Sequence, residues 1–435
     1  MSTAFLQVLL SLAAGIGLIV LLTVKFRVHA FFALFLACFV VGLGVQLPFA
    51  DIITAMKEGF GSILKSLGFV IMLGTTLGVI LEHTGATRVM AAAILRFVGE
   101  KNVTAAMGIT GFIVGLPIFC DSGYIVLSGL NKSVARRSGA SILVMSVSLA
   151  SGLYAVHCLV PPHPGATAAA GIIGVDIGRL ILTGGLVAIP AVIAGCWWAS
   201  FMGKKIPVKE VEEAETEDID IPDIPVWRAF LPILVPIVLI GLGTFGNMLR
   251  GLEIFHVLGD PVIALFIGVL LSIRSFRTAT MSRLVAEAAE KAGSILVIIG
   301  AGGAFGAVLA TTNIGSHVND AIHLGNLGVI FPFLLAALLK TAQGSSSVAV
   351  ITAASIVFPL LPALGLDSDM GRLLCMLALG GGSMTVSHAN DSYFWVISKF
   401  SGLEMQPMLR VFVVSTLLMG LTTLVMVYAL SWFLL

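Results

Sequence analysis

Long apolar stretches constrain this chain more than any other feature of its sequence. The first runs from Phe5 to Val24, and similar stretches recur along the rest of the chain. A helix needs roughly 20 apolar residues to cross the hydrocarbon core of a bilayer, so we expect about 10 to 12 spans and some half-spans. Hydrophobic residues occupy 58% of the 435 positions and charged residues only 11%, which a water-soluble fold could not bury.

The fold class follows from the same stretches. Backbone donors and acceptors in lipid must be satisfied within the protein, which leaves helices or closed barrels. The apolar runs are continuous and lack the period-two alternation of barrel strands. We therefore expect an all-α polytopic membrane protein. Because Lys25 and Arg27 follow the first apolar run, no cleaved signal peptide is expected.

Net charge and cysteine spacing exclude other classes of protein. The formal net charge is +1, which gives no electrostatic footprint for a nucleic acid. The five cysteines lie far apart, without the paired spacing of a metal or redox site. We expect no cofactor and no bound metal.

One polar segment divides the chain near its middle. Residues 203–228 contain lysines followed by a run of acidic residues, and we interpret them as a solvated cytoplasmic linker. Residues 1–202 and 229–435 would then form two repeats. Their glycine patterns support this division, since Gly68–Gly85 resembles Gly293–Gly315.

Basic residues predict how the two repeats are oriented. Lysine and arginine favour the cytoplasmic side of a membrane, and the clusters at 25–27, 204–228 and 274–291 can all lie there. Equivalent first helices then cross in opposite directions, so the repeats are inverted. This symmetry is typical of secondary transporters, whose binding site lies near the bilayer midplane.

Four polar breaks interrupt the apolar segments, two in each repeat. They are Pro117–Val126, Val156–Gly165, Thr341–Val350 and Val386–Tyr393. Unwound backbone in a membrane is tolerated only where it is buried in protein or lines a wet cavity. The breaks therefore predict re-entrant helical hairpins and discontinuous transmembrane helices that enclose one shared site.

The two hairpin breaks carry residues suited to a small acid. An ionised Asp121 would be disfavoured in the membrane by roughly 3 kcal/mol or more. We interpret it as a proton carrier or substrate partner, or else as a helix N-cap. Small hydrogen-bond donors follow Gln343 at the N-terminus of a half-helix, and such a terminus favours anions. The alternative is that these small residues only allow close helix packing.

The other two breaks carry histidines. His157 and His163 flank a proline-rich stretch, and His388 lies near Asp391. Histidine titrates near neutral pH, so a neighbouring aspartate could exchange protons with it and couple proton uptake to anion entry. Simple packing is the alternative for each histidine.

These breaks define the predicted site. The predicted substrate-binding residues are Asp121, Ser122, Gly123, Tyr124, His157, Pro162, His163, Gln343, Gly344, Ser345, Ser346, Ser387, His388, Asn390, Asp391 and Ser392. The predicted proton-coupling residues are Asp121, His157, His388 and Asp391.

Two glycine-rich stretches are superficially similar to nucleotide-binding motifs, but their sequence context excludes that function. The glycines at 300, 302, 303 and 306 are not preceded by a predicted strand, so we interpret them as helix-packing positions. Gly344–Ser347 lacks the lysine of a phosphate-binding loop. Energy must therefore come from an ion gradient or from the substrate gradient.

Two of the breaks resemble the gluconate:proton symporter family of permeases. The matching stretches are HCLVPPHPGAT at His157–Thr167 and SHANDSYFW at Ser387–Trp395. The resemblance implies proton-coupled import of gluconate or a related sugar acid across the bacterial inner membrane, and no enzymatic activity. Through a wider ion-transporter superfamily, it also implies scaffold and transport subdomains, a homodimer and an elevator-like movement.

Three alternatives stay open. Many gluconate permeases resemble one another in having a glutamate at the first hairpin tip, where this chain has Asp121, so a shorter acid, a uronate or a D-amino acid is also a candidate substrate. Unwound carbonyls and carboxylates could bind sodium in place of protons. An intramembrane enzyme that used His388 and Asp391 as acid and base would lack a convincing nucleophile.

Overall fold

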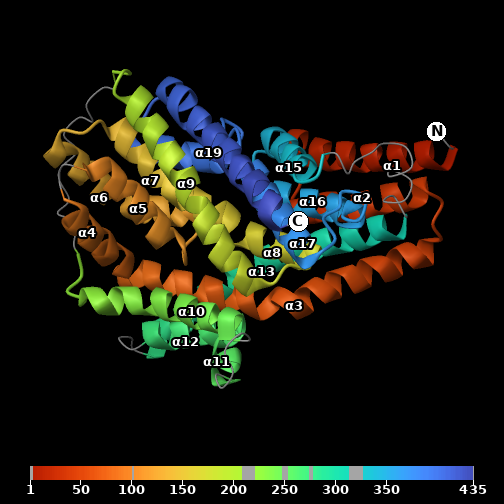
Figure 1. Ribbon diagram of the computed structural model, residues 1–435, viewed down its shortest axis with the longest axis horizontal. Helices are drawn as coiled ribbons and strands as arrows, with labels where there is room; N and C mark the ends of the chain where they lie inside the picture. Colours follow the sequence, from red (N-terminus) through yellow and green to blue (C-terminus); the bar gives the residue numbers. More distant parts are fainter. Residues whose placement is uncertain are drawn as a thin grey trace.

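The computed structural model describes residues 3–99, 102–207, 221–246, 253–273, 278–312 and 327–434. Every regular element within these residues is a helix (Figure 1). The predicted all-α fold is therefore confirmed. Most of the predicted acidic linker, residues 208–220, lies outside the described residues, as do the basic residues Arg274 and Arg277.

The first half of the chain contains long helices, a hairpin and an interrupted helix. Its α-helices are α1 (Thr3–Val20), α2 (Ala30–Gly44), α3 (Phe49–Thr84), α4 (Ala86–Val98), α5 (Val103–Gly115), α6 (Cys120–Ser138), α7 (Ile142–Leu159), α8 (Pro164–Ile173) and α9 (Ile177–Gly203). A π-helical turn, Leu21–Lys25, extends α1. The hairpin is α5–α6, and the interrupted helix is α7–α8.

The second half contains the same kinds of element. Its α-helices are α10 (Val226–Gly246), α11 (Glu253–Leu258), α12 (Pro261–Ile273), α13 (Thr278–Thr311), α15 (Ile330–Gln343), α16 (Ser346–Val357), α17 (Asp369–Met384), α18 (Ser392–Ser401) and α19 (Met405–Leu434). A 3₁₀ turn, Phe358–Leu360, follows α16. Here the hairpin is α15–α16, and the interrupted helix is α17–α18.

The two halves repeat one order of elements. Helices α1, α2 and α3 correspond to α10, α12 and α13, and the hairpin, interrupted helix and last long helix follow in each half. Contacts between the halves repeat in the same way when each helix is replaced by its counterpart. Helix α8 contacts α16, and their counterparts α18 and α6 contact each other. Helix α2 contacts α13, and their counterparts α12 and α3 contact each other. We assign α1, α2, α3, the α7–α8 pair and α9 as the crossings of the first half, with the α5–α6 hairpin re-entrant. This odd number starts the second half from the opposite side. The halves are inverted-topology repeats.

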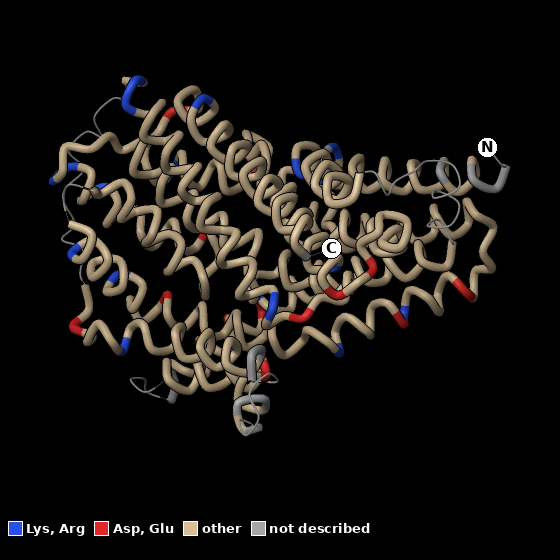
Figure 2. Tube along the Cα trace, viewed as in Figure 1, with Lys and Arg blue, Asp and Glu red and all other residues tan. Residues whose placement is uncertain are grey.

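The helices match a membrane in length and composition. Seven segments within the described residues are long and apolar enough to cross a bilayer, and shorter apolar helices include α2, α5, α12, α15 and α16. Long stretches of the chain carry no charged residue (Figure 2). Several crossings are therefore built from shorter or paired helices, as the predicted half-spans require.

The two longest helices pack closely against each other. Helix α3 has 36 residues and α13 has 34, and α3 is the lowest helix on the right side of Figure 1. A Cβ added at Gly303 would lie 2.7 Å from the carbonyl oxygen of Gly59, and one added at Gly300 would overlap the ring of Phe60. Close van der Waals packing of this kind drives helix association in lipid. These glycines of α13 therefore pack helices together.

The hairpins and interrupted helices gather beside this pair. Helices α8 and α16 both contact α13, and α8 also contacts α3. Helix α7 contacts α17, and α18 contacts both α6 and α7. The four interruptions, far apart in the sequence, thus lie in one region of the molecule.

We predict that Gly59→Ala weakens the packing of α3 on α13. The added methyl group would overlap the carbonyl of Gly303, and a backbone atom cannot move aside as a flexible side chain can. We expect a loss of roughly 1–3 kcal/mol and a lower midpoint of thermal unfolding in detergent. Gly61→Ala is the matched control on the same helix, because a Cβ at Gly61 has nothing within 4 Å. Equal midpoints for the two variants would contradict this packing.

Candidate functional site

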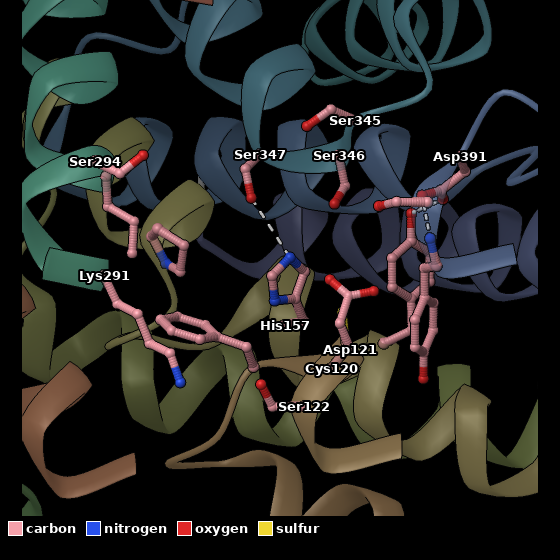
Figure 3. Close-up of a pocket in the computed structure, with 16 residues that line it drawn as sticks. Cys120, Asp121, Ser122, His157, Lys291, Ser294, Ser345, Ser346, Ser347 and Asp391 are labelled. Carbon is pink, nitrogen blue, oxygen red and sulfur yellow. Dashed lines mark hydrogen bonds between the residues drawn. The ribbon is translucent and has the colours of Figure 1, made fainter. Parts of the chain in front are cut away.

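The two hairpin tips and the two helix interruptions surround a cavity of about 410 Å³. This volume is within the range of about 300–1,000 Å³ that is usual for small-molecule sites. The lining residues are Phe119, Cys120, Asp121, Ser122, Tyr154, His157, Pro164, Lys291, Ser294, Ile295, Ser345, Ser346, Ser347, Asp391, Ser392 and Tyr393 (Figure 3). Both halves of the chain contribute to this cavity.

Four helices direct their N-terminal ends at the cavity. Helix α6 begins at Cys120, α8 at Pro164, α16 at Ser346 and α18 at Ser392, and each of these first residues lines the cavity. The first N–H groups of a helix lack partners within the helix, and the helix dipole adds partial positive charge at that end. The cavity therefore favours an anion.

The local sequence explains why the helices begin at these positions. Pro161, Pro162 and Pro164 prevent a regular helix before α8, and Pro164 occupies its first turn, where proline is tolerated. Ser345 caps α16, and Asp391 caps α18, each by accepting a hydrogen bond from a backbone N–H of the first turn. The breaks are thus helix starts as well as helix ends.

Asp121 and His157 present polar atoms with unmet hydrogen-bonding capacity. Asp121 lies in the first turn of α6, and its buried Oδ1 has no partner among the described residues. His157 lies in the last turn of α7. Its Nε2 is 3.4 Å from Ser347 Oγ, and its buried Nδ1 has no partner in the described part of the chain. Both side chains face the same space in Figure 3, where a ligand could satisfy them.

Both carboxylate oxygens of Asp391 have partners. Its Oδ2 lies 2.5 Å from Lys340 Nζ and accepts a hydrogen bond from Ser387 Oγ. The Tyr154 hydroxyl donates to the same oxygen at 3.5 Å, and the Tyr393 N–H donates to Oδ1 at 3.0 Å. Lys340 is fully buried, and 6% of the Asp391 side chain is exposed. Asp391 therefore has the counter-charge and the donors that a buried carboxylate requires.

Four predicted residues of the first half lie beside the cavity without lining it. Gly123 packs against Leu153, and Pro162 packs against α3. The Tyr124 hydroxyl is buried and hydrogen-bonds with a serine hydroxyl of α18. His163 donates from Nε2 to the last carbonyl of α5 at 2.7 Å. Gly123, Tyr124 and His163 thus join the α5–α6 hairpin to its neighbours, whereas Pro162 joins its break to α3.

Ser387, which donates to Asp391, lies outside the lining. Four other predicted residues of the second half also lie outside it. Asn390 Nδ2 donates to the carbonyl of Thr341 at 2.8 Å, and His388 Nε2 donates to the same carbonyl at 3.2 Å. Gly344 has a φ of 81° and leaves no room for a Cβ against the Asn390 carbonyl. The buried amide of Gln343 has no partner in the described residues. Apart from Gln343, this group fixes the α15–α16 tip to the break before α18.

Two lysines near the cavity were not among the predicted site residues. Lys340 lies inside the apolar helix α15, where an ionisable residue is a functional candidate by default, and that rule alone would have found it. Lys291 was expected only as part of a cytoplasmic basic cluster. It lines the cavity from α13 and pairs with Glu287 at 2.9 Å and Glu82 at 3.9 Å.

Comparison with known proteins identifies the family. Residues 7–433 match the model of the GntP family permease. The chain belongs to this family. It is 33% identical to the gluconate permease of Pseudomonas aeruginosa over 97% of this chain and 96% of that protein. It is 34% identical to the D-serine transporter DsdX of Escherichia coli K12 over 97% of this chain and 98% of that protein.

Membership of the family decides the class of protein. This GntP family permease is a multi-pass inner-membrane transporter and not an enzyme. Its fold is also similar to that of Neisseria gonorrhoeae MtrF, which is described within a class of antimetabolite efflux pumps. The TM-score is 0.65 over 87% of this chain and 83% of MtrF, at 17% identity, so that likeness concerns the fold alone.

We predict that Gly344→Ala impairs transport more than a positive φ alone explains. Gly402 has a φ of 69° with nothing within 4 Å of its Cβ position, so Gly402→Ala measures the backbone strain by itself. That strain is roughly 1–2 kcal/mol. Gly344→Ala adds an overlap with the Asn390 carbonyl, and we expect its initial uptake rate to be about tenfold below that of Gly402→Ala. Similar rates would show that the hairpin tip does not need this contact.

Proposed function

We propose that this permease imports gluconate or a related small sugar acid together with protons. The observation that carries the proposal is the convergence of four helix N-termini on one polar cavity. Their partial positive charges suit a carboxylate. The hydroxyls of Ser122, Ser345, Ser346, Ser347 and Ser392 can both donate to and accept from the hydroxyl groups of a polyol chain.

A D-amino acid is the second candidate substrate. The free Oδ1 of Asp121 could accept a hydrogen bond from an ammonium group while the helix N-termini bind the carboxylate. Competition separates the two classes of substrate. Gluconate, glycerate, a uronate and D-serine are each added in excess to labelled gluconate, and the strongest competitor identifies the substrate class.

Asp121 is the proposed proton carrier. Its carboxyl group faces the cavity and has no ion-pair partner among the described residues, whereas Asp391 has Lys340. An ionised Asp121 would repel an anionic substrate, and a proton on Asp121 removes that repulsion. Proton binding and anion binding then favour each other. His157, which also faces the cavity, can assist this exchange.

Alternating access is proposed to be elevator-like. Most of the cavity lining belongs to the hairpins and interrupted helices, whereas Lys291, Ser294 and Ile295 belong to α13. Movement of the first group along α3 and α13 would carry the cavity across the membrane. We also propose a homodimer, in keeping with the family resemblance. Cross-linking in native membranes measures that oligomeric state.

Reconstitution tests the coupling directly. Purified protein in liposomes receives an inwardly directed proton gradient or an inwardly directed sodium gradient, with labelled gluconate outside. Accumulation driven by the proton gradient and abolished by a protonophore supports the proposal. Accumulation that follows the sodium gradient alone supports sodium coupling, and failure of the proton gradient to drive accumulation of any tested acid contradicts the proposal.

We predict that Asp121→Asn separates coupling from binding. The amide keeps the shape of the side chain but cannot carry a proton, so proton-driven accumulation should fall at least about tenfold while exchange of labelled for unlabelled substrate continues. Asp51→Asn is the control, because Asp51 is exposed at the start of α3. Wild-type accumulation and pH dependence in Asp121→Asn would show that the proton binds elsewhere.

A further inference from the structure

Lys340 lies just behind the cavity, in the last turn of α15. It is fully buried, and its Nζ binds Asp391 Oδ2 at 2.5 Å. The same ammonium group donates a hydrogen bond to the carbonyl of Gly344 at the hairpin tip. It also lies 5.9 Å from the centre of the Tyr154 ring, which lines the cavity. One cation thus joins the α15–α16 tip, the break before α18 and the wall of the cavity.

The first repeat makes the equivalent connection without an ion pair. Asp391 is the N-cap residue of α18, and His163 is the N-cap residue of the corresponding helix α8. His163 joins that break to its hairpin by a hydrogen bond to the last carbonyl of α5. The two repeats therefore join hairpin to break at equivalent positions, but only the second repeat uses an ion pair to do so.

This difference makes the two carboxylates at the cavity unequal. Asp391 has a cation within ion-pair distance, and in the described part of the chain Asp121 has none. Lys291, the other lysine at the cavity, is bound by Glu287 and lies 3.9 Å from Glu82. The titratable groups that act on the Lys340–Asp391 pair are Cys120 and Asp121 from α6, Tyr154, His157 and Cys158 from α7, and Tyr393 from α18. None of these side chains carries a permanent positive charge.

We propose that Lys340 is a positioning residue that supplies a fixed counter-charge to Asp391, so that Asp121 is the one carboxylate of the cavity that exchanges a proton. The proposal rests on the proposed function, because it sets how many protons accompany each substrate. With the pair intact, Asp391 and Lys340 cancel each other and stay in place during the cycle. The cavity then gains one proton on Asp121 for each anion that it binds.

Removal of Lys340 changes this count. Loss of one member of a buried ion pair leaves an uncompensated charge, which is strongly disfavoured in a membrane protein. Asp391 then takes up a proton in place of its lost partner. Lys340→Met therefore gives the cavity two carboxyl groups that exchange protons. In Lys340→Met/Asp391→Asn the unpaired carboxylate is gone, and a single exchanging group remains.

The experiment measures protons carried per substrate in proteoliposomes, together with the pH dependence of initial uptake. We expect about one proton in the wild type and about two in Lys340→Met, with a slope of log rate against pH that changes from about −1 to about −2. The double variant should return to about one proton and transport faster than Lys340→Met. Lys399→Met is the matched control, since Lys399 is exposed near the end of α18.

The outcomes separate this proposal from the proposed function. An unchanged proton count and pH slope in Lys340→Met, with proton-coupled transport in the wild type, would overturn the role of Lys340 alone. A wild type that moves substrate without protons would overturn both. If Lys340→Met does not fold, the double variant tests the proposal by itself. Active transport with one proton per substrate in the double variant supports the pairing of Lys340 with Asp391. An inactive or unfolded double variant overturns it.

Discussion

The need to satisfy backbone groups inside a bilayer governs this structure. Every N–H and C=O in the hydrocarbon region must find a partner or a wet cavity, so an interrupted helix is costly unless its exposed end is used. Here four helices begin at one cavity, at Cys120, Pro164, Ser346 and Ser392. The free N–H groups that would destabilise an isolated break become the groups that favour an anion. The same interruptions that limit the fold thus create the site.

The two repeats have equivalent helix packing but contribute different side chains to the cavity. Packing between α8 and α16 matches packing between α18 and α6, so each half completes the cavity of the other. The first half contributes Asp121 and His157, and the second contributes the serine-rich tip and Asp391. One free carboxyl group and one ion-paired carboxyl group therefore face the same small volume. Proton exchange and substrate binding can be assigned to different residues for this reason.

Much of this architecture could be predicted from the sequence because the breaks stand out against apolar helices. Prolines at 161, 162 and 164 and the polar runs near Asp121 and Asp391 marked the places where the helices stop. The order of elements in the repeats followed from these breaks, and the all-α fold followed from the continuous apolar stretches between them. Asp121 and His157 were found because each is a titratable residue on a break, and both line the cavity.

The rest of the site depends on packing that a linear pattern does not contain. The sequence marks Lys340 as an ionisable residue in an apolar helix, but it does not show that its partner is Asp391, 51 positions away. Lys291 faces the cavity only because of how α13 packs. Each break also contains more polar residues than can line one small cavity. Tyr124, His163 and Asn390 therefore bind neighbouring helix ends and hairpin tips instead of lining the cavity.

The central claim is that the cavity selects a carboxylate through the converging helix ends. Calorimetric titration of the purified permease with gluconate and with sorbitol tests it most directly, because the two polyols have the same chain length and differ mainly in the carboxylate. We predict that gluconate binds at least about 100-fold more tightly, a difference of about 2.7 kcal/mol. Equal affinities for the acid and the neutral polyol would contradict the account.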